Sequence, residues 1–233
     1  LFRRHSDLKV ADPIKSICDL HKVFVACTGI DETLDHFYGW GQLLLADFDD
    51  IDKNMVDAKL LFANLSDIHE LDDVSYLTDY QKAMIKKFFS NFSDDHNTEL
   101  KKRFLQLWSH FYDIYVGFNQ KLAEQQLAYE GALYRKVVND EDIDFHYKKY
   151  LFIGFNMMQI VEQTLCDRLL KQGKALFYWD YDKYYMEGQN EAGHYIRQYL
   201  KHYPNELASY PQKDIYDNMS KNKDITYISA PTE

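Results

Sequence analysis

Glycine and proline are scarce in this sequence, with nine and four residues among 233. Proteins rich in β-turns use both residues repeatedly, because turns need left-handed or fixed backbone angles. Apolar residues make up 46% of the chain, enough to bury one large core or two small ones. The scarcity of turn formers therefore favours a folded, mostly helical protein.

Long hydrophobic runs and paired cysteines are also missing. No run approaches the roughly 18 apolar residues that a membrane span needs, and no signal peptide is visible, so we expect no membrane contact. Cys18, Cys27 and Cys166 are odd in number and widely spaced, which favours free thiols in a reducing cytoplasm. Because the sequence begins at Leu1 and not at Met, we expect a processed or truncated chain.

Dense positive charge is absent as well. The formal net charge is -10, and the densest basic group, Lys101 to Arg103, lies among acidic neighbours. Proteins that follow a phosphate backbone usually carry a basic stripe or patch. We therefore interpret Lys101 to Arg103 as a solvated helix face and expect no unaided grip on nucleic acid.

Apolar residues recur at helical spacing through the first 140 residues. Asp12 followed by Pro13 is typical of a helix start, and Gly29 is typical of a stop. The expected helices cover about 13–27, 34–62 with a bend near Asp50, 78–92, 97–127 and 132–137.

The period of the pattern changes near residue 143. Residues 150–155, reading YLFIGF, form a short continuous apolar run that is typical of a strand buried on both faces of a parallel sheet. A helix is expected over 157–171, a stop at Gly173 and a second buried strand over 175–179. The sequence therefore predicts one βαβ unit. A helix over 191–203 and a third strand, Ile225–Ile228, are expected to follow.

Taken together, these patterns predict an α/β fold that is predominantly helical. The expected domains are a mostly helical part, residues 1–142, and a βαβ part, residues 143–233. A right-handed crossover would add the third strand to the same sheet.

Motifs for nucleotide and DNA chemistry are missing or misplaced. A P-loop needs a glycine-rich turn followed by Lys and Ser or Thr, and none of the glycines begins one. The first predicted strand ends in Gly154 and Phe155 and not in the acidic pair that would hold magnesium. Glu99 and Lys101 spell the E-x-K of a nuclease but lie at a helix start, so we interpret the match as chance. No catalytic residue and no cofactor-binding residue is expected.

Carboxylates suggest two places for a divalent cation. Asp47, Asp49, Asp50 and Asp52 lack the glycine and terminal Glu of a calcium loop and keep helical phase, so a solvated helix face is favoured. Asp180 and Asp182 follow a probable strand, where α/β folds usually place ligands, and they are weak metal candidates. A polar loop is the favoured interpretation there too, and the surrounding tyrosines favour packing or protein contact over base stacking.

Three stretches resemble a known family: FYGWGQLLLADFDDIDKNMVDAKLLFANL at 37–65, LAYEGALYRKVV at 127–138 and KKYLFIGFNMMQIVEQTLCDRLLKQGKALFYWDYD at 148–182. In order and spacing they look like the N-terminal helicase-like half of PD-(D/E)XK nuclease family proteins from Bacteroidetes-type bacteria. Gly154, Phe155 and Glu162 match the strand, glycine, Phe and helix-borne Glu of the degenerate helicase region in the related AddB-type subunits.

The resemblance implies a partial P-loop-NTPase-like (RecA-like) parallel sheet whose ATPase residues have decayed, with a helical insertion at about 30–140. It also implies a parent exonuclease for DNA repair and recombination, whose magnesium-dependent nuclease domain lies beyond Glu233. The expected partners are DNA, through the full-length protein, and an AddA-like helicase-nuclease subunit.

The expected role is that of a non-catalytic scaffold that guides DNA or docks a subunit. Two alternatives remain open at the level of sequence. One is a helical interaction module that binds a partner helicase or nuclease subunit without touching DNA. The other is an unrelated helical enzyme that uses a metal at Asp180 and Asp182.

Overall fold

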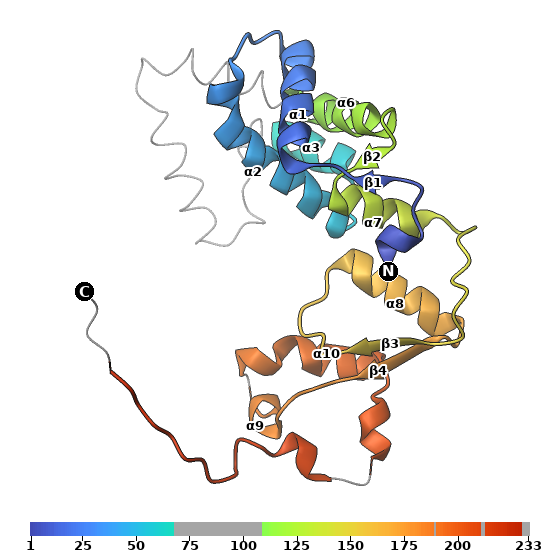
Figure 1. Cartoon of the computed structure of the whole chain (residues 1–233), viewed down its shortest axis with the longest axis vertical. Coiled ribbons are helices and arrows are strands. Elements are labelled where there is room, and N and C mark those ends of the chain that lie inside the picture. The colour runs from blue at the N-terminus through green and yellow to red at the C-terminus, as the bar shows by residue number, and fades with distance from the viewer. Residues whose placement is uncertain (68–108, 189, 211–212, 230–233) are drawn as a thin grey trace. The chain divides into compact units, whose positions relative to one another are not determined.

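The computed structural model describes residues 1–67, 109–188, 190–210 and 213–229 (Figure 1). The helix expected at 78–92, the Glu99 and Lys101 pair and the basic group Lys101 to Arg103 lie outside the described residues. The chain divides into two compact units, Leu1–Asp144 and Phe145–Glu233. This division falls beside the change of pattern near residue 143, and each unit is described by itself.

The first unit begins with a short 3-10 helix, η1 (Phe2–Arg4), and the helix α1 (Pro13–Thr28). The Asp12 carboxylate accepts the Lys15 main-chain N–H at 3.0 Å, which satisfies a free donor of the first turn. Gly29 ends the helix with a φ of +69°, a left-handed conformation that glycine adopts without strain. The sequence prediction of this helix is confirmed.

The helix expected over 34–62 is two helices, α2 (Leu34–Lys53) and α3 (Ala58–Asp67). Met55 adopts a φ of +55°, and the Val56 N–H turns back to the Ile51 carbonyl at 2.9 Å. A left-handed residue cannot continue a right-handed helix. The prediction of one bent helix was therefore wrong, because an apolar stripe can continue in phase across a turn that breaks the backbone.

The described residues of this unit also include two later helices, α6 (Phe111–Ala123) and α7 (Glu130–Asn139). Between them, the two-residue strand β2 (Leu127–Ala128) pairs in parallel with β1 (Lys9–Val10), a pair that the sequence pattern did not predict. The core between the helices is strongly aromatic and aliphatic, and its fully buried side chains include Ile17, Leu20, Phe24, Phe37, Phe48, Ile114, Phe118 and Leu122.

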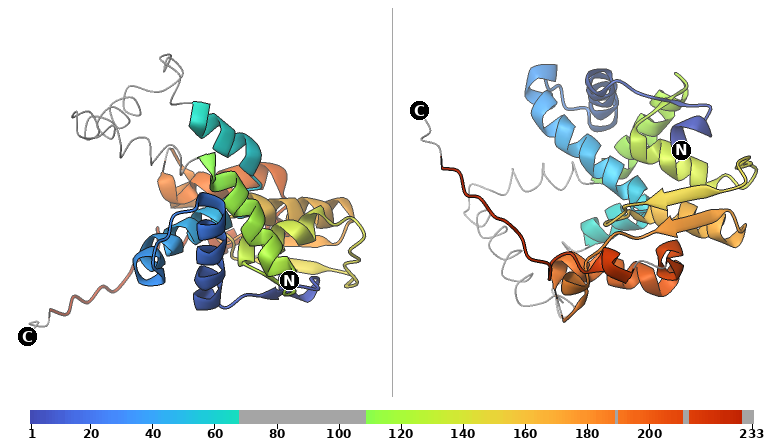
Figure 2. Two further views of the ribbon diagram at one scale, coloured as in Figure 1. Left: turned by 90° about the horizontal axis from the view of Figure 1, so that it is seen from above. Right: turned by 60° about the horizontal axis from the view of Figure 1, so that its bottom comes forward.

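The second unit is built on two parallel strands, β3 (Tyr150–Ile153) and β4 (Ala175–Tyr178), joined by α8 (Ile160–Lys171). Tyr150 pairs with Ala175 and Ile153 with Tyr178, and the strands run side by side in Figures 1 and 2. Gly173, with a φ of +65°, turns the chain from α8 toward β4. The predicted βαβ unit is confirmed.

Aromatic rings form the core of this unit on one face of the β3–β4 pair. Phe177 is 0% exposed and lies 4.6 Å from the ring of Tyr203, which belongs to the turn after α10 (His194–His202). The Tyr203 hydroxyl donates to Asp167 of α8 at 2.8 Å, so α8 and α10 share this face. Cys166 of α8 is also buried, and burial raises the pKa of its thiol to about 12.

The other face of β3 is not covered by the described residues of its unit. Leu151 is 56% exposed and Ile153 is 64% exposed, because alternate strand residues point away from the helices. The sequence prediction of a strand buried on both faces was therefore wrong. A continuous apolar run shows that the side chains on both faces of a strand are apolar. It does not show whether another element covers each face.

The remaining elements are short: α9 (Lys183–Met186) and the 3-10 helices η3 (Glu191–Gly193), η4 (Glu206–Ser209) and η5 (Lys213–Tyr216). Ile225–Ile228 is not a strand. It runs as an extended segment (Figure 1), and the exposed fractions of Tyr227 and Ile228 are 91% and 89%. The prediction of a third strand was wrong.

The described residues thus form a mostly helical α/β structure with two parallel pairs of strands. None of the described helices combines the length and the apolar character that crossing a membrane requires.

Candidate functional site

A cavity of about 410 Å³ lies at the carboxyl ends of β3 and β4. Its lining includes the loop after β3, with Gly154 and Phe155, and the loop after β4, with Asp180 and Asp182. Parallel strands that point the same way bring these loops to one edge of the sheet, which is where α/β folds usually bind ligands. The structure therefore brings four of the residues singled out from the sequence into one place.

Gly154 shapes the loop after β3 that lines this cavity. Its φ is +72°, and its N–H still donates to the Tyr178 carbonyl at 3.3 Å before the chain leaves the sheet. A Cβ at this position would meet nothing within 4 Å, so the backbone angle and not close packing explains the glycine. The ring of Phe155, in the next position, lies 6.0 Å from that of Phe152.

Asp182 binds the backbone of its own unit. Its Oδ1 accepts the N–H of Tyr184 at 3.0 Å, and its Oδ2 accepts those of Asn218 at 2.7 Å and Met219 at 2.8 Å. Desolvation opposes ionisation, but these backbone donors outweigh it and hold the pKa of Asp182 below its usual value. Both carboxylate oxygens are therefore engaged in joining the start of α9 to the segment at Asn218 and Met219. A carboxylate engaged in this way does not suit a metal ligand.

Asp180 differs from Asp182 in having no hydrogen bond or ion pair with another described residue. Its side chain is exposed at the edge of the cavity. In the described part of the chain, no three His, Cys, Asp or Glu side chains lie together as a metal site. The geometry thus gives no support to the alternative of a metal enzyme that uses Asp180 and Asp182.

Glu162 lies at the start of α8 and not in the cavity lining. Its carboxylate accepts the Gln159 main-chain N–H at 2.9 Å, and the Gln159 side chain accepts the Glu162 N–H in return. This reciprocal arrangement is a capping box, which satisfies two free donors of the first turn. It also places a negative charge at the helix end where a nucleotide-binding protein would receive phosphate.

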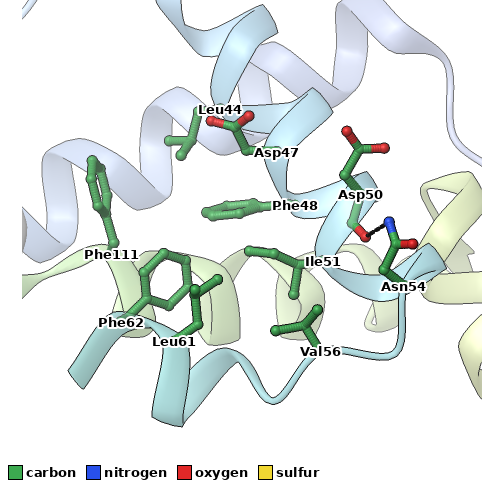
Figure 3. Close-up of a pocket in the computed structure, with 10 residues that line it drawn as sticks. All are labelled: Leu44, Asp47, Phe48, Asp50, Ile51, Asn54, Val56, Leu61, Phe62 and Phe111. Carbon is green, nitrogen blue, oxygen red and sulfur yellow. Dashed lines mark hydrogen bonds between the residues drawn. The ribbon is translucent and has the colours of Figure 1, made fainter. Parts of the chain in front are cut away.

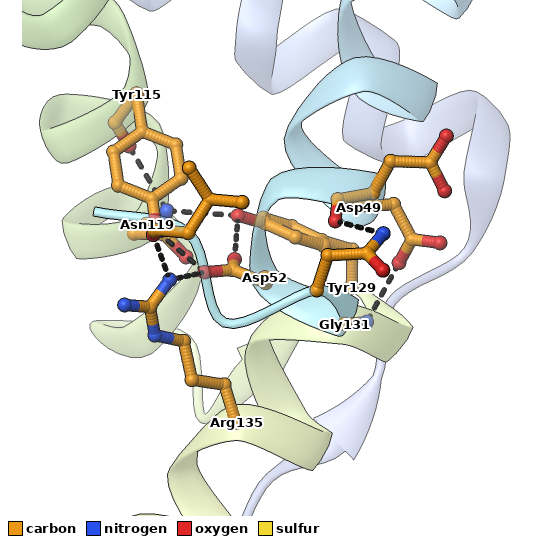
Figure 4. Close-up of polar contacts among 10 residues, drawn as sticks. Asp49, Asp52, Tyr115, Asn119, Tyr129, Gly131 and Arg135 are labelled. Atoms are coloured by element: carbon orange, nitrogen blue, oxygen red, sulfur yellow. Dashed lines mark hydrogen bonds and ion pairs between the residues drawn. The ribbon is translucent and has the colours of Figure 1, made fainter. Parts of the chain in front are cut away.

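The most extensive buried polar cluster of the described residues lies in the first unit and was missed at the level of sequence. Asp52 of α2 is 1% exposed, although its acidic run was interpreted as a solvated helix face. Figure 4 shows four side chains around it, two from α6, one from the N-cap of α7 and one from α7 itself. The Tyr115 hydroxyl donates to Oδ1 at 2.6 Å, the Tyr129 hydroxyl donates to Oδ2, and the Arg135 guanidinium lies 3.1 Å from Oδ1.

The same cluster is extended on both sides. Arg135 also donates to the Val56 carbonyl at 2.7 Å, and Asn119 donates to the Tyr129 hydroxyl at 3.0 Å. Burial and the Asp52 charge raise the pKa of Tyr115 and Tyr129 well above the usual value, so both remain neutral donors. With every partner donating inward, the cluster joins α2, α6 and α7 and is best explained as structural.

A second cavity, of about 620 Å³, lies between α2, α3 and α6 (Figure 3). Its walls are mainly core side chains such as Phe48 and Phe62, and its polar groups, Asp47, Asp50 and Asn54, belong to the end of α2. Burial, with a smaller contribution from Asp50, raises the pKa of Asp47.

No protein-family model, curated protein or solved structure matches the chain.

Proposed function

We propose that the chain is a non-catalytic, helicase-like segment of an AddB-type DNA repair exonuclease and that it docks an AddA-like helicase-nuclease subunit. The resemblance of residues 37–65, 127–138 and 148–182 to that family supports the assignment. The β3–α8–β4 unit is the building block that a partial RecA-like sheet would use. Magnesium would serve the nuclease domain of the parent protein and not this segment.

The observation that carries the docking role is the uncovered face of the β3–β4 pair. Leu151 and Ile153 pair in register with Leu176 and Tyr178, so the four side chains share one face. Parallel sheets occur almost only with both faces covered. A parallel pair with two aliphatic side chains more than half exposed therefore fits a segment that completes its packing against another polypeptide.

The charges of the chain support a non-catalytic role. A motor needs amides free to hold phosphate, but Glu162 caps the first turn of α8 with a carboxylate. The net charge of -10 also favours a protein partner over DNA, because DNA binding depends on released counterions and basic side chains. A DNA-guiding role would have to draw its positive charge from other parts of the parent protein.

The docking role is tested by binding to an AddA-type helicase-nuclease subunit at about 50 mM and about 200 mM salt. The unaltered chain should bind with nearly equal affinity at both, because apolar contact responds little to salt. Replacing Leu151 and Ile153 together by Thr should weaken binding at least about tenfold, since Thr keeps strand propensity but removes apolar surface.

Leu43→Thr is the matched control, because Leu43 is 68% exposed but lies on α2 in the other unit. It should leave binding unchanged. Equal binding by the control and the double variant would contradict docking through β3. Tight binding of a DNA duplex that falls steeply with salt would instead favour DNA guidance.

A further inference from the structure

The cavity at the carboxyl ends of β3 and β4 combines aromatic rings with negative charge. Its described lining includes the aromatic side chains of Phe155, Tyr181 and Tyr185 and the carboxylates of Asp180 and Asp182. No Lys, Arg or His is found among the described residues that line it. The charged side chains among the described lining residues are therefore both carboxylates.

Two cations lie beside the cavity, where main-chain oxygens of the residues around it accept their hydrogen bonds. The Arg197 guanidinium donates to the main-chain oxygens of Tyr185 at 2.9 Å and Asn190 at 2.8 Å. The Lys223 ammonium donates to the Met219 carbonyl at 2.8 Å. Because Asp182 is satisfied by three backbone donors, Asp180 is the carboxylate that remains open to a ligand.

The aromatic walls are held in place before any ligand arrives. Tyr181 stacks on Tyr216 with ring centroids 4.2 Å apart and planes 10° apart. The Tyr216 hydroxyl is fixed in turn by Asn205, whose amide donates to it at 2.9 Å. Tyr185 places its hydroxyl 3.8 Å from the Met219 sulfur. A fixed aromatic surface loses little entropy when a ligand binds.

Each ligand class makes different demands on such a space. Phosphates and carboxylates would be repelled by Asp180 and Asp182, and a neutral apolar group would gain nothing from Asp180, whose exposed carboxylate would stay hydrated. An organic cation gains from the faces of aromatic rings and from a carboxylate together. A volume of about 410 Å³ is sufficient for the end of a Lys or Arg side chain.

We propose that this cavity binds an organic cation, an alkylammonium or guanidinium group, between its aromatic walls and Asp180. The site is separate from the exposed face of β3 and does not depend on the docking proposal. The cation could belong to a free amine or to a basic side chain of another protein, and these two sources share the same recognition chemistry.

The test is calorimetric titration of the whole chain with butylammonium and butylguanidinium, with butanol as a neutral probe of similar length. At least one cation should bind while butanol and inorganic phosphate do not. Asp180→Asn should weaken cation binding about tenfold, which corresponds to about 1.4 kcal/mol. Tyr185→Leu should weaken it too, because it removes an aromatic face but keeps apolar bulk.

Asp31→Asn is the control, since it removes a carboxylate that is also exposed but lies in the other unit, and it should leave affinity unchanged. Near-ultraviolet circular dichroism confirms that each variant is folded. Equal binding of butanol and the cations, an unaltered affinity in Asp180→Asn, or no binding of either cation would overturn the proposal. An Arg-containing peptide that binds more tightly than butylguanidinium would support it and identify a protein as the source.

Discussion

Asp52→Ala is expected to destabilise the first unit by about 3 to 5 kcal/mol, the usual cost of breaking a buried ion pair. The substitution removes the acceptor of the Tyr115 and Tyr129 hydroxyls and the partner of Arg135. Tyr129 is only 5% exposed, so water cannot replace the lost acceptor without opening the core. Urea denaturation, with hydrogen exchange to report on each unit, measures the change.

Asp50→Ala is the matched control on the same helix. The Asp50 side chain is exposed, and its contact with Asn54 uses the main-chain carbonyl, which the substitution keeps. This variant should change the free energy of unfolding by no more than about 0.5 kcal/mol. Similar losses in the two variants would contradict the structural role assigned to the Asp52 cluster.

Phe177→Ala is expected to destabilise the second unit by about 3 to 5 kcal/mol, as large-to-small changes of buried aromatic residues do. Phe177 is 0% exposed and contacts a ring of β3, the ring that directly follows β4 and a ring of the turn after α10: Phe152 at 5.1 Å, Trp179 at 5.8 Å and Tyr203 at 4.6 Å. Removal of the ring leaves a cavity at the centre of the aromatic core that covers one face of the β3–β4 pair. Urea denaturation, with hydrogen exchange to report on this unit, measures the effect.

Leu151→Ala on the neighbouring strand provides the comparison. Leu151 is 56% exposed on the opposite face, so its truncation should cost less than about 1 kcal/mol in the isolated chain. A loss as large as that of Phe177→Ala would mean that the β3 face is already covered, and it would remove the basis of the docking proposal.

Local signals in the sequence were sufficient for much of the fold. Asp12 and Pro13 begin α1 and Gly29 ends it, because caps and left-handed glycines act within one turn of the helix. The β3–α8–β4 unit follows from two short apolar runs separated by a helical period. Asp180 and Asp182 were placed at the cavity by their position after β4, since parallel strands end at a common edge.

Partners that are distant in sequence explain the largest failures. Asp52 lies four residues after Phe48 and so on its helix face, a sign that this carboxylate is buried, but its partners stand 63 to 83 residues away. Ile225–Ile228 has the composition of a strand, yet a strand also needs an edge to pair with. The role of Asp182 as an acceptor for Asn218 and Met219 was hidden for the same reason.

DNA-stimulated ATP hydrolysis by the purified chain is the decisive measurement for a helicase-like segment without phosphate chemistry. We expect turnover no greater than that of a buffer blank, with or without single-stranded DNA and magnesium. Turnover that rises with DNA would contradict this expectation, most clearly if replacement of Glu162 by Gln changed the rate.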